Sequence, residues 1–527
     1  MAPQHPHRPQ VSVVVIGYDD AGHLMDAVRS ALEQGPAVHE VIAVDDGSTD
    51  GSGALLDRLA AGDPRLTVVH RRVNSGGCGT PRNDGLDTAT APYVMFLDSD
   101  DVLPSGAVDA LLTAAARHGA QVAAGLCVRR ELPSGREVPW QPRLYEHPAV
   151  IARPARRPRL VHDTLCVNKL YCTAFLREHT IRFPEGRFPY EDFVFTARVL
   201  AAAPRMVLVP DPVYIWHVRR TAGRPSLSLD RARPANWHAR VEANRQVHEI
   251  LLGAGEKRLA RAARTKFLDH GLRMYARELE QRDPAYVAAW WTITREFLAG
   301  FDAGDLAAAP APGRVTAQVV LASETPRDLP RLRELAARPA RLCPPYPRAA
   351  DGTPIWSADL PQVTLEHLLV RPVRVLPAAV DAKLRPRARG AQLRLRLHEL
   401  YGRMAQARPL SVDIEFTGRV DGRTGLRRTV AWSGAAGSWV AETSIDLSSL
   451  ASGTWDLRLR LRFADGTARE ATAHAAGTRR TAVPSRRHGI LLVQPYATHS
   501  GSLAVRLAPG LRGAAGVLRR RLFRLLH

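Results

Sequence analysis

Two acidic clusters occur near the N-terminus, and each directly follows a short apolar run. Asp45–Asp50 follows the run Glu40–Val44, and Asp98–Asp101 follows Val94–Leu97. Carboxylates packed this closely repel one another unless a cation or hydrogen-bond donors offset their charge. Their hard oxygen atoms suit Mg²⁺ or Mn²⁺, in particular an ion that bridges a diphosphate. The sequence therefore predicts a site for a divalent metal and a phosphorylated ligand.

The second cluster also has a simpler interpretation, in which Asp100 or Asp101 caps a helix that begins near Ser105. A lone Asp-x-Asp is a weak signal of metal binding. Two acidic clusters at strand ends are a stronger one, and we favour the metal site.

The elements around these clusters are typical of an α/β domain. Val11–Ile16 is a continuous β-branched run, as expected of a strand buried on both faces of a parallel sheet. Helices and strands then alternate, with helices expected at residues 23–34, Gly53–Ala61 and Pro81–Ala89 and strands at Glu40–Val44, Leu66–His70 and Tyr93–Leu97. In such sheets ligands bind beyond the carboxyl ends of the strands, where both acidic clusters lie.

The motifs of this region resemble a known family. The sequence reads VSVVVIGYDD, then VIAVDDGSTDGS, then NSGGCGTPRNDGLDTATAPYVMFLDSDD, followed by NKLY and IRFPEGRFPYEDFVF. Together with the aromatic and basic segment Tyr214–Ser228, these stretches are similar to the nucleotide-binding half of family 2 glycosyltransferases with the A-type fold. The resemblance covers about residues 10–230.

The resemblance implies roles on the donor side of the site. Asp46 would bind the uracil or ribose of a nucleotide-sugar donor, with Tyr18 near the base. Arg82 and Asn83 would lie against the nucleotide and its phosphates. Many relatives have Pro-x-Tyr-Asn after the first strand, whereas this chain has Ile16–Asp19 (IGYD), so we expect a different backbone before the tyrosine.

The resemblance also implies the catalytic groups. Asp98 would contact the ribose or a metal-bound water and Asp100 would ligate the divalent metal, which neutralises charge on the departing diphosphate. Asp192 would be the general base that takes the proton of the acceptor hydroxyl, and one base with in-line attack gives inversion. Glu191 would be structural or bind the acceptor.

A basic stretch near the end of this region has two interpretations of equal weight. His217, Arg219 and Arg220 could belong to a closing loop that contacts the diphosphate or completes the metal shell. They could equally form an ordinary basic surface turn after the strand Met206–Val209.

The rest of the chain changes character twice. An amphipathic helical stretch is followed by the linker-like Ala303–Arg314, and beyond about residue 365 apolar residues alternate with polar ones, which indicates a β-sandwich. We expect a catalytic domain at 1–230, a helical extension at 231–302, a linker and helical connector at 303–364, a β-sandwich-like module at 365–510 and a basic amphipathic tail at 511–527.

The formal net charge is +21, which favours anionic partners. Bias from a GC-rich genome is an equal explanation, because Arg, Ala, Pro and Gly codons are GC-rich. No nucleic-acid-binding motif is present, and we expect no nucleic-acid partner. A polyanionic acceptor would account for the excess of positive charge, because basic residues could bind it.

We infer the location of the protein in the cell from kinds of segment that the sequence does not contain. No run of about 18 apolar residues occurs, and the five cysteines match no disulfide or zinc framework, so we expect a cytoplasmic protein. The tail at 511–527 could dock on anionic lipid at the inner membrane face, as a peripheral contact, or fold onto the β module.

The leading hypothesis is an inverting, metal-dependent glycosyltransferase that uses Mn²⁺ or Mg²⁺ and a UDP-linked hexose or N-acetylhexosamine. Its layout is similar to enzymes that glycosylate wall teichoic acid, so the acceptor would be a cell-envelope polymer, teichoic acid or polysaccharide. The β module would bind polymer or form a homo-oligomer. Two alternatives stay open: a nucleotidyltransferase, although no Gly-rich loop with a following Arg and Lys lies near the first strand, and a carbohydrate-binding scaffold with an inactive transferase domain, although Asp98, Asp100 and Asp192 are all present.

Overall fold

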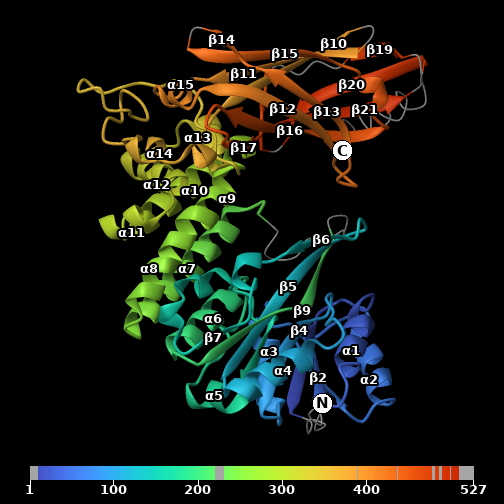
Figure 1. The fold of residues 1–527 in the computed structure, drawn as a ribbon. Helices are drawn as coiled ribbons and strands as arrows, with labels where there is room; N and C mark the ends of the chain where they lie inside the picture. The colour runs from blue at the N-terminus through green and yellow to red at the C-terminus, as the bar shows by residue number, and fades with distance from the viewer. Residues whose placement is uncertain are drawn as a thin grey trace. The chain divides into compact units, whose positions relative to one another are not determined.

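The chain folds into two compact units, Met1–Phe267 and Leu268–His527 (Figure 1). The computed structural model describes residues 10–219, 231–387, 390–435, 437–476, 481–485, 489–498 and 500–509. Arg220 and the basic tail expected at 511–527 lie outside the described residues.

The first unit is built on a mixed sheet, nine-stranded in the described residues, in the order β3-β2-β1-β4-β8-β5-β9-β7, with β6 paired to β5. The neighbours β3, β2, β1 and β4 run parallel, as predicted, whereas β8 runs antiparallel to both β4 and β5. The strands are β1 Val11–Gly17, β2 Val38–Asp45, β3 Leu66–His70, β4 Tyr93–Asp98, β5 Val122–Leu132, β6 Arg136–Pro139, β7 Ala149–Ile151, β8 Lys169–Cys172 and β9 Met206–Arg219.

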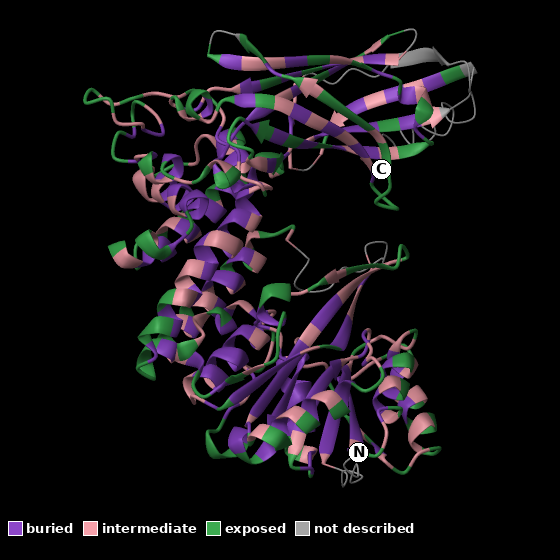
Figure 2. Cartoon of the chain, viewed as in Figure 1, coloured by how far each residue is buried: buried purple, intermediate pink, exposed green. Residues whose placement is uncertain are grey.

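Helices cover this sheet, which is why its central strands are apolar throughout. They are α1 Leu24–Leu32, α2 Ser52–Ala60, α3 Gly79–Thr88, α4 Ala107–His118, α5 Thr173–Glu178, α6 Glu191–Ala201, α7 Pro234–Gly253 and α8 Lys257–Lys266. The central strands β1, β4 and β8 are almost wholly buried, as the purple colour of the central strands in Figure 2 shows, whereas β6 is mostly exposed. Helix α3 lies so close to β1 that a Cβ atom on Gly85 would be 2.2 Å from Val14 Cγ1. A glycine is therefore needed there for the helix to approach the strand.

The register brings the two acidic clusters to the same edge of the sheet. Gly17, the last residue of β1, is opposite Asp45, and Ile16 is opposite Asp98 on the other side. The carboxyl ends of β2 and β4 thus flank the end of β1, as expected for parallel strands.

The second unit begins with helices, and one expectation about it is wrong. The segment Ala303–Arg314, expected as a linker, forms α11 (Ala303–Ala308) and the start of α12 (Ala311–Ala322). Asp302 and Asp305 form a reciprocal capping box at α11, and Pro312 sits in the first turn of α12, where proline is tolerated. The other helices of this unit are α9 Arg273–Ala276, α10 Pro284–Leu298, α13 Leu329–Ala336, α14 Glu366–Leu369 and α15 Arg403–Ala407.

The unit ends in two sheets, which confirms the predicted β-sandwich-like module. The described strands form one sheet in the order β14-β15-β11-β10-β18 and another in the order β13-β12-β16-β21-β20-β19, with β17 paired to β16. Buried and exposed residues alternate along these strands (Figure 2), so each sheet has one apolar face. The strands are β10 Val380–Arg387, β11 Gly390–His398, β12 Pro409–Gly418, β13 Thr424–Ala431, β14 Ser433–Ala435, β15 Ser438–Ile445, β16 Gly453–Phe463, β17 Ala468–Ala471, β18 His474–Ala475, β19 Thr481–Ser485, β20 Gly489–Ala497 and β21 Leu503–Pro509.

Within the second unit, one buried arginine ties the helical part to the sheets. Arg341 follows α13 and donates to Glu334 Oε2 at 2.5 Å and to the Ser500 carbonyl oxygen at 2.5 Å. It also donates to Thr472 Oγ1 at 2.5 Å. Because its charge is fully compensated, the loop after α13 is fixed to the sandwich. None of the helices in the described residues has the length and apolar character needed to cross a bilayer.

Candidate functional site

The loop after β4 contains three carboxylates in different environments. Asp101 is buried and accepts hydrogen bonds from the Tyr214 hydroxyl at 2.7 Å and the His217 backbone N–H at 2.7 Å. Burial and the neighbouring Asp100 raise the pKa of Asp101 well above its usual range. Helix α4 begins at Ala107 with Gly106 as its N-cap residue and without a side-chain cap, so the alternative in which Asp100 or Asp101 caps it is wrong. Asp101 instead fastens β9 to the loop.

Asp98 and Asp100 are the accessible pair, with side chains 32% and 45% exposed. Partial burial and the adjacent negative charge of Asp98 raise the pKa of Asp100 to about 6. A cation bound beside Asp100 would stabilise its ionised form, because it would offset the negative charge of Asp98.

One arginine joins the acidic loop to the segment expected to hold the base. Arg82, in the first turn of α3, donates to Asp98 Oδ1 and to Glu191 Oε1, each at 2.6 Å. It is 3% exposed, and its guanidinium lies 5.3 Å from the centre of the Phe183 ring. Three predicted site residues from α3, β4 and α6 therefore form one ion-pair network.

Asp192 lies beside this network in the first turn of α6. Burial and the negative charge of Glu191 raise the pKa of Asp192 to about 7, against the opposing effect of the cations Arg82 and Lys266. No side chain among the described residues donates a hydrogen bond to its carboxylate. The group is thus poised to take and release a proton near neutral pH.

Strand β9 brings His217 and Arg219 to the acidic loop. Arg219 donates to Asp100 Oδ2 at 3.2 Å and to the Asp100 carbonyl oxygen at 3.0 Å. His217 Nδ1 lies 3.0 Å from that same carbonyl, so Nδ1 carries the proton and Nε2 is the acceptor nitrogen. Burial lowers the pKa of His217 and favours the neutral ring. These contacts exclude the alternative of an ordinary surface turn.

Asp46 lies after β2 in a nest of donors from the loop after β3. It accepts from Ser75 Oγ at 2.8 Å and from Asn74 Nδ2 at 3.0 Å, and Arg71 Nε forms an ion pair with it at 3.0 Å. Burial raises the pKa of Asp46 in spite of these donors. Sequence reasoning quoted the segment with Asn74 and Ser75 but gave these residues no role, and it missed Arg71. The contact of Asp46 with a nucleotide stays a prediction.

Tyr18 lies at the end of β1 and is 39% exposed. The next residue, Asp19, has a φ of 48°, an angle that asparagine and aspartate tolerate better than most residues. Its backbone N–H donates to Ser48 Oγ at 3.0 Å, and its Oδ1 accepts from the Thr49 backbone N–H at 2.7 Å. The loop after β1 is thereby tied to the loop after β2.

Asn83 is buried in α3 and binds protein groups. Its amide nitrogen donates to the Phe183 carbonyl oxygen and to Glu185 Oε1, each at 3.0 Å, and its amide oxygen accepts from the Phe183 N–H at 2.9 Å. In this structure Asn83 fixes the segment before α6, and its predicted contact with the phosphates stays a prediction.

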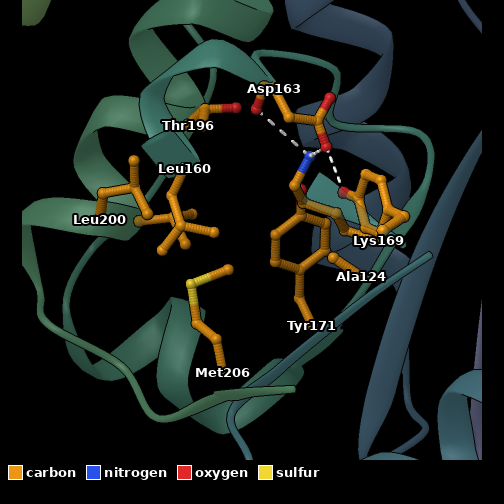
Figure 3. Close-up of a pocket in the computed structure, with 10 residues that line it drawn as sticks. Ala124, Leu160, Asp163, Lys169, Tyr171, Thr196, Leu200 and Met206 are labelled. Carbon is orange, nitrogen blue, oxygen red and sulfur yellow. Dashed lines mark hydrogen bonds and ion pairs between the residues drawn. The ribbon is translucent and has the colours of Figure 1, made fainter. Parts of the chain in front are cut away.

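The NKLY motif forms a buried polar network behind α6. Asp163 accepts from Lys169 Nζ at 2.8 Å, Asn168 Nδ2 at 3.0 Å and Trp140 Nε1 at 3.1 Å, and also from the Tyr145 hydroxyl. Figure 3 shows Lys169 pointing to Asp163 at the edge of a cavity whose other lining residues are mostly aliphatic, with Thr196 and two tyrosines. The cavity volume is about 10 Å³, which holds one water at most, so this is a structural centre and no sugar site.

Two buried cations that sequence reasoning missed come from α7 and α8. The Arg240 guanidinium lies 5.0 Å from the centre of the Tyr190 ring and 5.2 Å from that of Phe193. Lys266 Nζ is 4.8 Å from the centre of the Phe193 ring and donates to the Val161 carbonyl oxygen at 3.1 Å. Burial and the charge of Arg240 lower the pKa of Lys266 to about 7. Both helices are rich in arginine, and nothing in their pattern singles out these two residues.

The arrangement fits a metal that a diphosphate helps to hold. In the described residues no three His, Cys, Asp or Glu side chains gather into a complete metal site. Arg82 and Arg219 each pair with one oxygen, Asp98 Oδ1 and Asp100 Oδ2, and no described side chain donates to the second oxygen of either carboxylate. Mg²⁺ in particular is commonly bound by one or two carboxylates with phosphate oxygens completing its shell.

Comparison with known proteins agrees with the fold. Residues 12–180 match the family model "Glycosyl transferase family 2". A poly(ribitol-phosphate) beta-glucosyltransferase of Bacillus spizizenii is 28% identical over 235 residues, 44% of this chain and 36% of that protein. The succinoglycan biosynthesis protein ExoO of Rhizobium meliloti is 30% identical over 236 residues, 42% of this chain and 64% of that protein. The matched parts therefore span between about a third and two thirds of these relatives.

Solved structures extend the likeness over both units. A crystal structure of S. aureus TarS has a TM-score of 0.54 and 19% identity, covering 95% of this chain and 85% of that one. A TarS fragment, residues 1–349 in complex with UDP-GlcNAc, has a TM-score of 0.51 and 21% identity over 66% of this chain and 96% of that one. The predicted architecture, an A-type α/β domain followed by helices and a sheet-rich C-terminal part, is confirmed.

Proposed function

We propose that the protein is an inverting glycosyltransferase with a UDP-linked donor, on the premise that residues 12–180 match the model of glycosyl transferase family 2. The observation that carries the proposal is the link made by Arg82. It joins Asp98, on the donor side, to Glu191, whose neighbour Asp192 has a pKa of about 7. A donor-side carboxylate and a candidate base are thereby held in one network.

On the donor side, Tyr18 and Asp46 bind the nucleotide. Tyr18 presents an exposed ring at the end of β1, and aromatic faces stack on bases. The TarS fragment solved with UDP-GlcNAc supports a uridine donor. The sugar itself, hexose or N-acetylhexosamine, is open to experiment.

The diphosphate would bind at the loop after β4, where Asp100 and Asp98 would hold Mn²⁺ or Mg²⁺. When bound, the ion neutralises negative charge on the leaving nucleoside diphosphate. Arg219 is fixed at this loop by Asp100 and adds a donor for phosphate oxygens, and the neutral His217 offers Nε2.

On the acceptor side, Asp192 takes the proton of the attacking hydroxyl. Its pKa matches a base that works near neutral pH. A single base and a direct displacement invert the anomeric centre. Glu191 is engaged by Arg82 and keeps that arginine in place, so we assign it a positioning role.

The acceptor is a phosphate-bearing polymer of the cell envelope. Two kinds of observation support this class: the relatives that act on poly(ribitol-phosphate), and the excess of basic residues in this chain. The cytoplasmic location stays a prediction.

Separate assays of binding and transfer test the proposal. We expect wild-type protein with Mn²⁺ to transfer sugar from one member of a panel of UDP-sugars to poly(ribitol phosphate). Asp192→Asn should bind UDP with unchanged affinity and transfer roughly 10²- to 10⁴-fold more slowly. Asp100→Ala should weaken the Mn²⁺-dependent part of UDP binding. Full transfer by Asp192→Asn would contradict the assignment of the base, and absence of transfer with every donor would contradict the function.

A further inference from the structure

One outward face of the C-terminal sandwich carries unbalanced positive charge. Alternate residues of β10, β11 and β15 point away from the apolar interior of the sandwich. On this side the described charged side chains are five cations, Lys383, Arg385, Arg387, Arg394 and Arg396, and two carboxylates, Asp381 and Glu442. We call these seven residues the basic face.

The strand register holds like charges together on this face. Lys383 on β10 is directly opposite Arg394 on β11, an arrangement that destabilises a sheet. Arg394 pairs with Glu442 at 3.1 Å, but Lys383 and Arg385 form no ion pair with any described residue. Asp381 is opposite Arg396 on β11, but its ion pairs are with His398 at 2.7 Å and His474 at 3.5 Å. The two carboxylates of the face therefore relieve only part of its electrostatic cost.

The other sheet shows that an arginine-rich composition does not require this imbalance. On β16, Arg458 is opposite Glu415 and Arg460 is opposite Asp413 of β12. Arg462 also pairs with Asp413, at 2.6 Å. By the same register, Asp381 faces Arg396 and Glu442 faces Arg394 on the basic face, which leaves Lys383, Arg385 and Arg387 without a facing carboxylate. Base composition of the genome would affect both sheets alike.

We propose that the basic face binds a linear polymer with a phosphodiester in each repeat unit. Cations two residues apart along a strand are about 6.6 Å apart, and neighbouring strands are about 4.8 Å apart. Lys383, Arg385 and Arg387 form one row and Arg394 and Arg396 a second, which suits a chain of regularly spaced single negative charges. The inference rests on the proposed function, since this polymer is the acceptor class named there.

Such a site would act separately from the catalytic site. A polymer held at the sandwich has its remaining hydroxyl groups at high local concentration, which lowers the KM for long acceptors without changing contacts at the reacting centre. Short acceptors of one or two repeat units would gain nothing from it.

The test compares two matched double variants of the full chain. Lys383→Gln/Arg385→Gln removes two exposed cations from the basic face, and Arg458→Gln/Arg460→Gln removes two from the compensated face. Binding of a fluorescent poly(ribitol phosphate) chain is measured at several salt concentrations without any nucleotide sugar. KM values are then measured for long and short acceptors.

We expect the basic-face variant to bind the polymer roughly tenfold more weakly at 0.15 M salt, with a log–log salt slope smaller by about 1 to 2. Its KM should rise for the long acceptor only, and its melting temperature should not fall, because a like-charge pair is removed. The control variant should bind as the wild type does. Equal losses in both variants, no loss in either, or an equal face-dependent affinity for duplex DNA or anionic vesicles would overturn the proposal. Polymer binding is measured without turnover, so a failure of the transferase activity would be seen separately.

Discussion

At the scale of single residues, the site is a set of carboxylates whose neighbours give them different roles. Asp98 is paired with a buried arginine, Asp100 is kept near its titration range by a like charge, and Asp101 is buried as a structural anchor. Burial and the charge of Glu191 raise the pKa of Asp192 to about 7, because they outweigh the opposing charges of Arg82 and Lys266. All four residues are aspartates, so the different roles proposed for them follow from their surroundings and not from residue type.

The raised pKa of Asp192 has a consequence for stability. A carboxyl with a pKa near 4 in the unfolded chain and about 7 in the folded protein binds its proton more tightly when folded. Its contribution therefore favours folding at acid pH and declines as pH rises from about 4 to 7. We predict that Asp192→Asn raises the melting temperature by a few degrees at pH 8 and has little effect near pH 4.

For Asp163→Asn we predict the opposite effect on the melting temperature. The Lys169 ammonium and other donors keep the pKa of Asp163 below its usual value in spite of its burial. Removing that charge should lower stability at pH 8 by roughly 3–5 kcal/mol, because the buried Lys169 loses its partner. Melting curves of both variants at pH 5 and pH 8 check the pair. A destabilised Asp192→Asn at pH 8 would contradict the raised pKa.

At the scale of elements, β9 and helices α6 to α8 add residues to the site that begins at the carboxyl ends of β1, β2 and β4. Strand β9 brings His217 to the loop after β4, and α6 presents Asp192 at its first turn. Helices α7 and α8 place Arg240 and Lys266 against the aromatic rings on either side of that turn. The proposed acceptor side of the site thus includes residues beyond 12–180, the range that matches the family model.

We predict that Lys266 sets the ionisation of Asp192. Its charge lowers the pKa of Asp192, so Lys266→Met should move the acid limb of the pH profile of kcat/KM upward by about half a unit to one unit. Lys266→Arg, which keeps the charge, should restore the wild-type midpoint. Lys169→Met removes another buried lysine of this unit and should destabilise the protein without moving the midpoint. A Lys266→Met enzyme with lower activity but an unchanged midpoint would show a purely structural role.

The sequence predicted the elements that a short stretch of residues identifies, such as an apolar run or a cluster of acidic residues. The run Val11–Ile16 and the acidic residues after β2 and β4 sufficed to place Asp46, Asp98 and Asp100 at one sheet edge. Long-range contacts have no such signal, which is why His217 had two interpretations and Lys266 none. Ala303–Arg314 was mistaken for a linker because its Ala, Pro and Gly content hid the capping box of Asp302 and Asp305.

At the scale of the whole molecule, the chain joins an α/β unit to a module with one basic face. In the proposed function, the first unit would supply the transfer chemistry, and the sandwich would supply charge that suits a long phosphate-bearing acceptor. Self-association through the sandwich stays a prediction, and so does membrane docking of the segment 511–527, which lies outside the described residues.

The central claim is a single displacement with Asp192 as the only base, and the configuration of the product tests it most directly. Once the active UDP-sugar is known, proton NMR of the glycosylated acceptor gives the anomeric coupling constant of the new linkage. From an α-linked donor the account predicts a β-linked product, formed by the wild type and lost in Asp192→Asn. An α-linked product would require a second displacement or a different mechanism, and it would contradict the account.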